Sequence, residues 1–264
     1  MRISALILTV WALMALAGTL PSLEPHLVSL PEIFAPPSAD HWLGTDELGR
    51  PVLDRLLTGA SVSLFVALTT VTLSALIGIS VGLIAGYFGG GIDRVISRLI
   101  EVFLAFPGML LAIAMAAMIG PGIDNVIIAL AVMGWVGYAR LVRVQVLALR
   151  QRDHVLAATA LGRTNLAIMA RHLLPLVMAP VWVEASFGLA GAVVAEAGLS
   201  FLGLGIQPPD ASWGGMIRDG VRYLLVAPHL VMAPGVALFL VVLAANLFGD
   251  GLRDRFDVTS RNMR

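Results

Sequence analysis

Apolar residues in this chain are grouped into long runs, separated by shorter stretches that carry most of the charge. A helix needs about 20 apolar residues to cross the hydrocarbon core of a bilayer. Runs of this kind predict an all-α integral membrane protein with six transmembrane helices. The expected spans cover residues 3–20, 61–88, 99–120, 125–143, 173–197 and 229–249.

The fourth and fifth runs are weaker than the others. The fourth is short unless it borrows length from Asn125 or from a snorkelling Arg140, and the fifth contains Glu184 and Glu196. An ionisable residue inside a membrane is a functional candidate by default. Both glutamates and the nearby Ser200 are therefore candidates for a substrate pathway. The alternative for each glutamate is a neutral, hydrogen-bonded carboxyl group facing a partner helix.

The first run has an alternative as a secretory signal. Arg2, the apolar stretch and the small residues around Ala15–Ala17 imitate a signal peptide with its cleavage site. Five further spans follow, so an uncleaved first helix is the simpler interpretation.

Composition agrees with a membrane protein. The chain is 58% hydrophobic and 13% charged, with a mean hydropathy of +0.91, which leaves too little polar surface to cover a soluble globule. Its formal charge is zero, so no basic bias indicates nucleic acid. We expect one transmembrane domain over residues 1–264.

Most of the 17 cationic side chains, all arginines, lie in alternate loops. Cytoplasmic loops retain arginine, so this asymmetry predicts that both termini are cytoplasmic. Residues 144–172 then form a cytoplasmic connection, and residues 21–60 and 198–228 lie on the outer side.

Two local patterns concern helix packing and charge pairing. Ser74, Gly78, Gly82 and Gly86 recur every four residues, which places small residues on one helical face and predicts close approach by another helix. The pattern leaves open whether that helix belongs to this chain or to a partner. Glu101 lies three residues after Arg98, a spacing that favours a surface ion pair.

No catalytic or metal-binding motif is present. The sequence lacks cysteine, a P-loop, a nucleophile elbow and a His-Glu-x-x-His motif, and its five histidines are scattered. We therefore expect no enzyme activity, metal site or cofactor on this chain. If transport is active, its energy comes from an ion gradient or from another polypeptide.

The stretch LAATALGRTNLAIMARHLLP, residues 156–175, lies between two apolar runs and predicts a short helix, a turn and re-entry into lipid. It resembles the EAA loop of ABC-importer permeases. Further segments in consistent order resemble the dipeptide, oligopeptide and nickel permeases, and they run almost from residue 40 to the end: HWLGTDELGR (41–50), AGYFGGGIDR (85–94), LAFPG (104–108), EAGLSFLGLGIQPP (196–209), WGGMI (213–217) and NLFGDGLRDRFD (246–257).

The resemblance implies the six-helix permease fold of the methionine importer, in a bacterial inner membrane. It implies a homologous second permease, two cytoplasmic ATPase subunits that hold ATP and Mg²⁺, and an extracytoplasmic binding protein that faces residues 44–55 and 207–222. Leu156 replaces the acidic residue that names the motif, so docking through this loop relies on shape. The loop residues expected to couple the chain to an ATPase are Ala157, Ala158, Gly162, Arg163, His172, Leu174 and Pro175.

The cargo stays open at this point. Di- and oligopeptides and free or chelated nickel share these motifs, and the lack of clustered histidine tilts the choice slightly towards peptides or a chelated metal. A gradient-driven secondary transporter or channel is the main alternative, and it would work without an ATPase. A membrane scaffold that recruits cytoplasmic proteins is the third class.

Overall fold

A computed structural model describes residues 1–261 of the chain, with side chains described to residue 256. These residues form helices and contain no strand. The elements are α1 (Arg2–Ala17), a 3-10 turn (Leu30–Glu32), α2 (Val52–Phe88), α3 (Gly90–Leu104), α4 (Gly108–Ile119), α5 (Ile123–Leu149), α6 (Asp153–Ala160), α7 (Asn165–Ile168), a π-helical turn (Met169–Leu173), α8 (Leu174–Phe201), α9 (Trp213–Val221) and α10 (His229–Arg261).

Four helical stretches are long and apolar enough to cross a membrane: Val52–Phe88, Ile123–Leu149, Asn165–Phe201 and His229–Phe256. They match four of the six predicted spans. At the first predicted span, α1 is apolar but has only 16 residues. The third predicted span is broken into α3 and α4.

The break between α3 and α4 is a bend of 84°. Pro107 precedes the first turn of α4 and has no N–H to donate to a continuing helix. The residue before a proline is also disfavoured in the helical region, which ends α3 before Phe106. The span predicted over 99–120 thus consists of two helices joined by this bend, and together they are long and apolar enough for one crossing.

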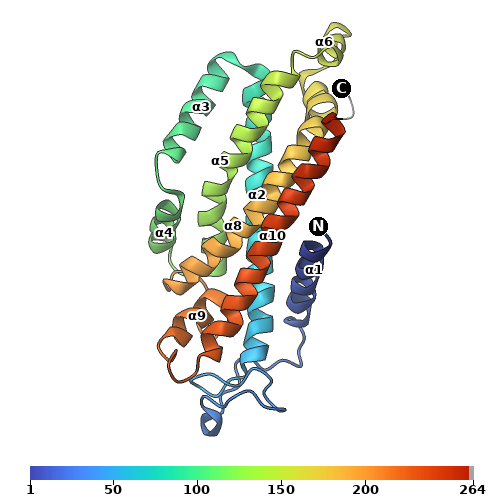
Figure 1. Ribbon diagram of the computed structural model, residues 1–264. Coiled ribbons are helices and arrows are strands. Elements are labelled where there is room, and N and C mark those ends of the chain that lie inside the picture. The colour runs from blue at the N-terminus through green and yellow to red at the C-terminus, as the bar shows by residue number, and fades with distance from the viewer. Residues whose placement is uncertain (262–264) are drawn as a thin grey trace.

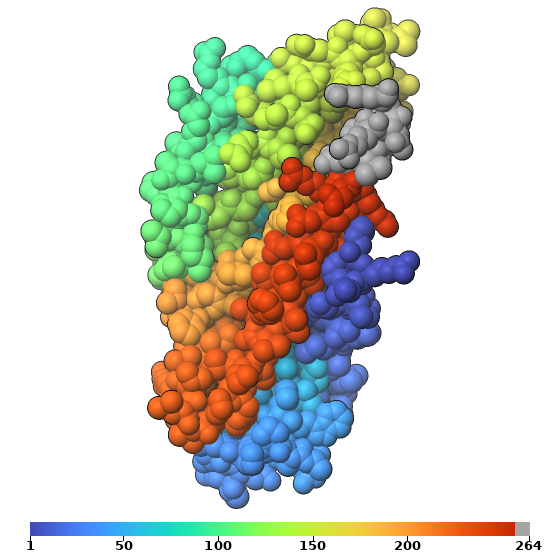
Figure 2. Space-filling view, in the orientation of Figure 1, coloured from blue at the N-terminus to red at the C-terminus, as the bar shows by residue number. Residues whose placement is uncertain are grey.

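The long helices run side by side as a bundle (Figure 1). Helices α3 and α4 lie along one side of the bundle and α1 lies along the other, next to α10. Helix α6 lies at one end, whereas α9 and the connector before α2 lie at the opposite end. In Figure 2, α10 crosses the visible face between α8 and α1. Both α1 and α10 direct their free ends towards the end of the bundle that carries α6.

The partner of the small-residue ladder is α5 of the same chain. A Cβ added at Gly78 would lie 2.5 Å from the carbonyl oxygen of Trp135, and one at Gly82 would lie 2.6 Å from that of Ala139. A Cβ at Gly86 would lie 2.8 Å from the Cβ of Val146. The backbones of α2 and α5 are thus in contact, and the question that the sequence left open is resolved.

The first turns of α2 pack against α9 at one end of the bundle. Trp213, at the first position of α9, is 0% exposed, and its Nε1 donates a hydrogen bond of 3.0 Å to the carbonyl oxygen of Leu56. Gly59 leaves room for the ring, because a Cβ there would lie 2.9 Å from Cδ1 of Trp213. Trp213 therefore joins α9 to α2.

A buried ion cluster fixes the connector to α2. Asp46 Oδ2 accepts from Nε of Arg50 at 2.7 Å and lies 3.4 Å from Nε of Arg55, and all three residues are at most 6% exposed. Asp46 Oδ1 also accepts the backbone N–H groups of Leu48 and Arg50. This pairing accounts for the start of α2 at Val52, earlier than the expected residue 61, because it lets Arg55 lie inside the protein.

We expect Asp46→Ala to destabilise the protein strongly. Removing the carboxylate leaves two buried guanidinium groups without their shared partner, a change that costs about 3–5 kcal/mol in comparable buried pairs. Thermal unfolding of the purified protein in detergent measures the effect. Asp40→Ala is the control, because Asp40 is exposed on the same connector. Equal melting temperatures for the two variants would contradict a structural role for the cluster.

Candidate functional site

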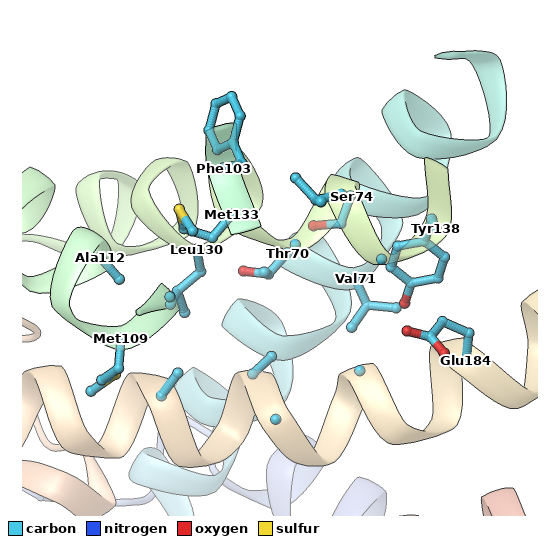
Figure 3. Close-up of a pocket in the computed structure, with 18 of the residues that line it drawn as sticks. Thr70, Val71, Ser74, Phe103, Met109, Ala112, Leu130, Met133, Tyr138 and Glu184 are labelled. Carbon is cyan, nitrogen blue, oxygen red and sulfur yellow. The ribbon is translucent and has the colours of Figure 1, made fainter. Parts of the chain in front are cut away.

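A cavity of about 430 Å³ lies between α2, α5, α8 and the bent pair α3–α4. Figure 3 shows its walls. Its apolar lining includes Phe103 at the end of α3, Met109 and Ala112 on α4, and Leu130 and Met133 on α5. The break at Pro107 positions this wall, because it turns α4 relative to α3.

Four polar side chains face this apolar lining. Thr70 and Ser74 come from α2, Tyr138 from α5 and Glu184 from α8 (Figure 3). The hydroxyl groups of Thr70, Ser74 and Tyr138 are buried and have no hydrogen-bond partner among the described residues. Buried polar groups are normally hydrogen-bonded, so three unpartnered hydroxyls around one cavity indicate a ligand or water site.

Three glycines keep space open around these polar groups. A Cβ at Gly137 would lie 3.0 Å from Oε1 of Glu184, and one at Gly188 would lie 2.6 Å from the hydroxyl oxygen of Tyr138. A Cβ at Gly134 would overlap Oγ of Ser74. Any larger residue at these positions would push a polar group out of place.

Glu184 and Glu196, predicted together, have different surroundings. Glu184 is partly exposed and lines the cavity. Glu196 is 0% exposed and accepts hydrogen bonds from Oγ of Ser63 at 3.1 Å and Oγ of Ser200 at 2.8 Å. Neither Glu196 nor Ser200 lines the cavity. The bond from Ser63 connects α2 to α8, and the surroundings of Glu196 fit the alternative of a hydrogen-bonded carboxyl group. A place for Glu196 and Ser200 in the substrate pathway stays a prediction.

The predicted coupling loop folds into α6, α7 and the π-helical turn at one end of the bundle (Figure 1). Ala157 is exposed, whereas Ala158 is buried in the same apolar cluster as Val155 and Ile168. Of the two adjacent alanines, only Ala157 is thus available to a partner. Gly162 follows α6 with φ of +74°, a left-handed conformation that glycine adopts without strain.

The remaining predicted loop residues lie along the path into α8. Arg163 is exposed, and His172 is partly buried in the π-helical turn, with its ring centroid 6.5 Å from that of His154. Leu174 is partly buried, and Pro175 occupies the first turn of α8, as predicted. The turn leads directly into α8, so continuous helical backbone joins the loop to the span.

Three exposed leucines on this loop add to the predicted set. Leu156 is 54% exposed, Leu161 is 84% exposed and Leu166 is 72% exposed. From the sequence, Leu156 is notable only because it replaces the acidic residue of the motif. The sequence signal that could have identified these leucines is their place in a short arginine-containing segment between two spans. Large apolar side chains that are exposed together mark interaction sites.

One charge pair expected from the sequence is present in α3. Arg98 and Glu101 form the expected surface ion pair, with NH1 of Arg98 2.8 Å from Oε2 of Glu101. No group of three or more potential metal ligands occurs among the described residues. The three cavity hydroxyls were missed, because serine, threonine and tyrosine in an apolar helix carry no distinctive sequence pattern.

Comparison with known proteins relates the fold to a transport family. Residues 78–261 match the model of the family described as binding-protein-dependent transport system inner membrane component. A dipeptide transport system permease protein of Alkalihalophilus pseudofirmus is 45% identical over 84% of this chain and 73% of its own length. A glutathione transport system permease protein of Pectobacterium atrosepticum is 43% identical over the same shares.

The solved structures agree on the fold. A chain of the MetNI methionine ABC transporter, in an inward-facing conformation, superposes with a TM-score of 0.62 at 21% identity, covering 77% of this chain and 97% of that chain. A chain of an amino acid ABC transporter gives a TM-score of 0.55 at 18% identity, covering 76% and 94%. The expected methionine-importer-like architecture is confirmed.

Proposed function

This chain belongs to the family of binding-protein-dependent transport system inner membrane components, and on that premise we propose that it carries short peptides across the membrane. It is a permease subunit of an ABC importer, as its curated relatives are. The observation that carries the choice of cargo is the high identity to permeases named for a dipeptide and for glutathione, a tripeptide. These two permeases are named for peptides and not for nickel, and the cavity lining includes no histidine.

The proposed importer needs further subunits. The sequence has no P-loop, so ATP and Mg²⁺ would be held by two separate ATPase subunits, and this chain itself would be no enzyme and bind no cofactor. A second permease would complete the membrane part. An extracytoplasmic binding protein would deliver cargo, which fits a family described as binding-protein-dependent.

The two ends of the bundle fit different partners. The end with α6 holds the exposed Leu156, Leu161 and Leu166 beside Arg163, and the distribution of arginine supports a cytoplasmic location for this end. It would receive the ATPase. The opposite end carries α9 and the connector, which would meet the binding protein. Both termini would then be cytoplasmic, in the inner membrane of a bacterium.

Coupling would run from the loop into the membrane. The exposed face around Ala157 would enter a groove on the ATPase, and closure of the ATPases would move the π-helical turn and Pro175 with it. Because α8 begins at Leu174 and carries Glu184, such a displacement would reach the cavity through one helix.

Co-purification tests the assignment of partners. The tagged chain is expressed with the neighbouring genes of its operon, extracted in mild detergent and analysed by mass spectrometry. We expect a second permease and an ATPase to be retained in comparable amounts. Recovery of the chain alone, in a monodisperse form, would count against an ABC importer and favour a transporter that works by itself.

A further inference from the structure

The cavity combines features that point to a charged group on the cargo. Glu184 supplies a carboxylate and has no hydrogen bond or ion pair with the described residues. The lining includes no Arg, Lys or His. A carboxylate in apolar surroundings is unfavourable unless it is neutral or meets a cation. The chain itself offers no cation in the cavity, so the ligand can supply one.

The hydroxyl groups indicate which kind of cation fits the cavity. An ammonium group has three N–H donors and no acceptor, and hydroxyl oxygens can accept from it. The buried hydroxyl of Tyr138 lies next to the carboxylate in Figure 3, and those of Ser74 and Thr70 follow along α2. One carboxylate and several unpartnered hydroxyls on one side of a cavity match the donors of a primary ammonium.

We propose that Glu184, with the hydroxyl of Tyr138 beside it, binds the N-terminal ammonium group of a short peptide while the peptide is inside this subunit. Glu184 is then a residue that selects cargo by charge within the membrane, in addition to any selection by the binding protein. This inference rests on the proposed function, since it takes its cargo class from there.

The remaining lining fits the rest of such a ligand. Side chains such as Phe103, Met109 and Met133 provide apolar contacts for small peptide side chains, and flexible methionines adapt to different shapes. The lining contains no cationic side chain that could pair with the carboxylate end of the peptide. The arrangement recognises the amino end and is permissive towards the side chains.

A substitution at Gly137 tests the role of the Glu184 carboxylate in a second, independent way. A Cβ at this position would lie 3.0 Å from Oε1 of Glu184, so Gly137→Ala displaces the carboxylate without removing its charge. Gly235→Ala is the matched control, because a Cβ at Gly235 would meet no atom within 4 Å. Glu101→Gln is the control for the loss of a glutamate charge, since Glu101 pairs with Arg98 at the surface.

The test measures binding to the purified importer complex in nanodiscs, without the binding protein. Equilibrium dialysis compares dialanine with N-acetyl-dialanine, which lacks the ammonium group. We expect the wild-type complex to bind dialanine about tenfold or more tightly than the acetylated form. Glu184→Gln should abolish this preference, and Gly137→Ala should reduce it, whereas Glu101→Gln and Gly235→Ala should keep it.

A parallel uptake assay with the complete importer distinguishes failure of the ammonium site from failure of the proposed cargo. If wild type takes up dialanine with ATP but does not bind it in preference to the acetylated form, or if Glu184→Gln keeps the preference, the ammonium site is wrong and the peptide importer stands. If wild type takes up neither dialanine nor glutathione with ATP, the proposed cargo is wrong and the ammonium site falls with it. Loss of binding in Glu184→Gln with normal assembly of the complex supports the proposal.

Discussion

Gly82→Val is expected to prevent this chain from forming a stable bundle. A Cβ at Gly82 would lie 2.6 Å from the carbonyl oxygen of Ala139, 2.9 Å from the Cβ of Val142 and 3.1 Å from the backbone nitrogen of Arg143. Two of these three atoms belong to the α5 backbone, so no change of side-chain rotamer can relieve the overlap. Valine adds two further methyl groups, and α2 must move away from α5.

The expected cost is on the order of 3 kcal/mol, at the upper end of what overpacking costs. Helices in a membrane associate through close packing and not through a hydrophobic drive, so lost contact between α2 and α5 is poorly replaced. The separation would also displace Ser74 and Tyr138, which project from these helices into the cavity.

The fraction of detergent-extracted protein that elutes as a monodisperse species measures this effect. Gly235→Val is the control, because it makes the same substitution in a membrane helix at a position where a Cβ meets no atom within 4 Å. We expect aggregation or degradation of Gly82→Val and normal recovery of Gly235→Val. Similar recovery of both variants would show that the α2–α5 contact is not essential.

Leu161→Asp is expected to disconnect the permease from its ATPase while leaving the bundle intact. Leu161 is 84% exposed at the end of α6, so its replacement removes little packing within the chain. A buried, unpaired aspartate in an apolar protein contact costs several kcal/mol, enough to lower affinity for the partner by about a hundredfold or more. Transport driven by ATP should fall to background.

Co-elution of the ATPase and ATP hydrolysis stimulated by the loaded binding protein are the two readouts. Leu225→Asp serves as control, because Leu225 is fully exposed at the opposite end of the bundle, after α9. It should retain the ATPase. Gly162→Asn tests the turn separately, since asparagine tolerates the left-handed conformation and should keep coupling, whereas Gly162→Trp should not. Normal ATPase recovery with Leu161→Asp would reject the proposed docking surface.

Hydropathy predicted the positions of the long helices well, because the bilayer sets their length whatever their partners. It placed the start of α2 too late, since Asp54 and Arg55 interrupt the apolar run. The charge of Arg55 is compensated by Asp46, and that pairing depends on how a connector folds back. Tertiary contacts of this kind cannot be read from local composition.

The site was only partly predictable for a similar reason. Glu184 and Glu196 have equivalent sequence signals, as single acids in one apolar run, yet one lines the cavity and the other bonds to Ser63 of another helix. The two glutamates are twelve residues apart on one helix. This spacing alone does not show which neighbouring helix each of them faces. The hydroxyls of Thr70, Ser74 and Tyr138 belong to one site only because α2 and α5 bring them close to Glu184 of α8.

For the loop, the resemblance predicted some features but not how its side chains pack. It directed attention to the two adjacent alanines and Gly162, and the positive φ of Gly162 fits the expected turn. The burial of Ala158 against its own chain and the exposure of Leu161 follow from how α6 packs on the π-helical turn. A motif alone does not specify that packing.

The most direct test of the importer assignment is uptake by proteoliposomes that contain this chain with its second permease and ATPases, supplied with the binding protein outside. We predict accumulation of labelled dialanine or glutathione when ATP is enclosed with the ATPases, and no accumulation when an ion gradient replaces ATP. Uptake by liposomes that contain this chain without ATPases, driven by a proton or sodium gradient, would contradict the account and identify a secondary transporter.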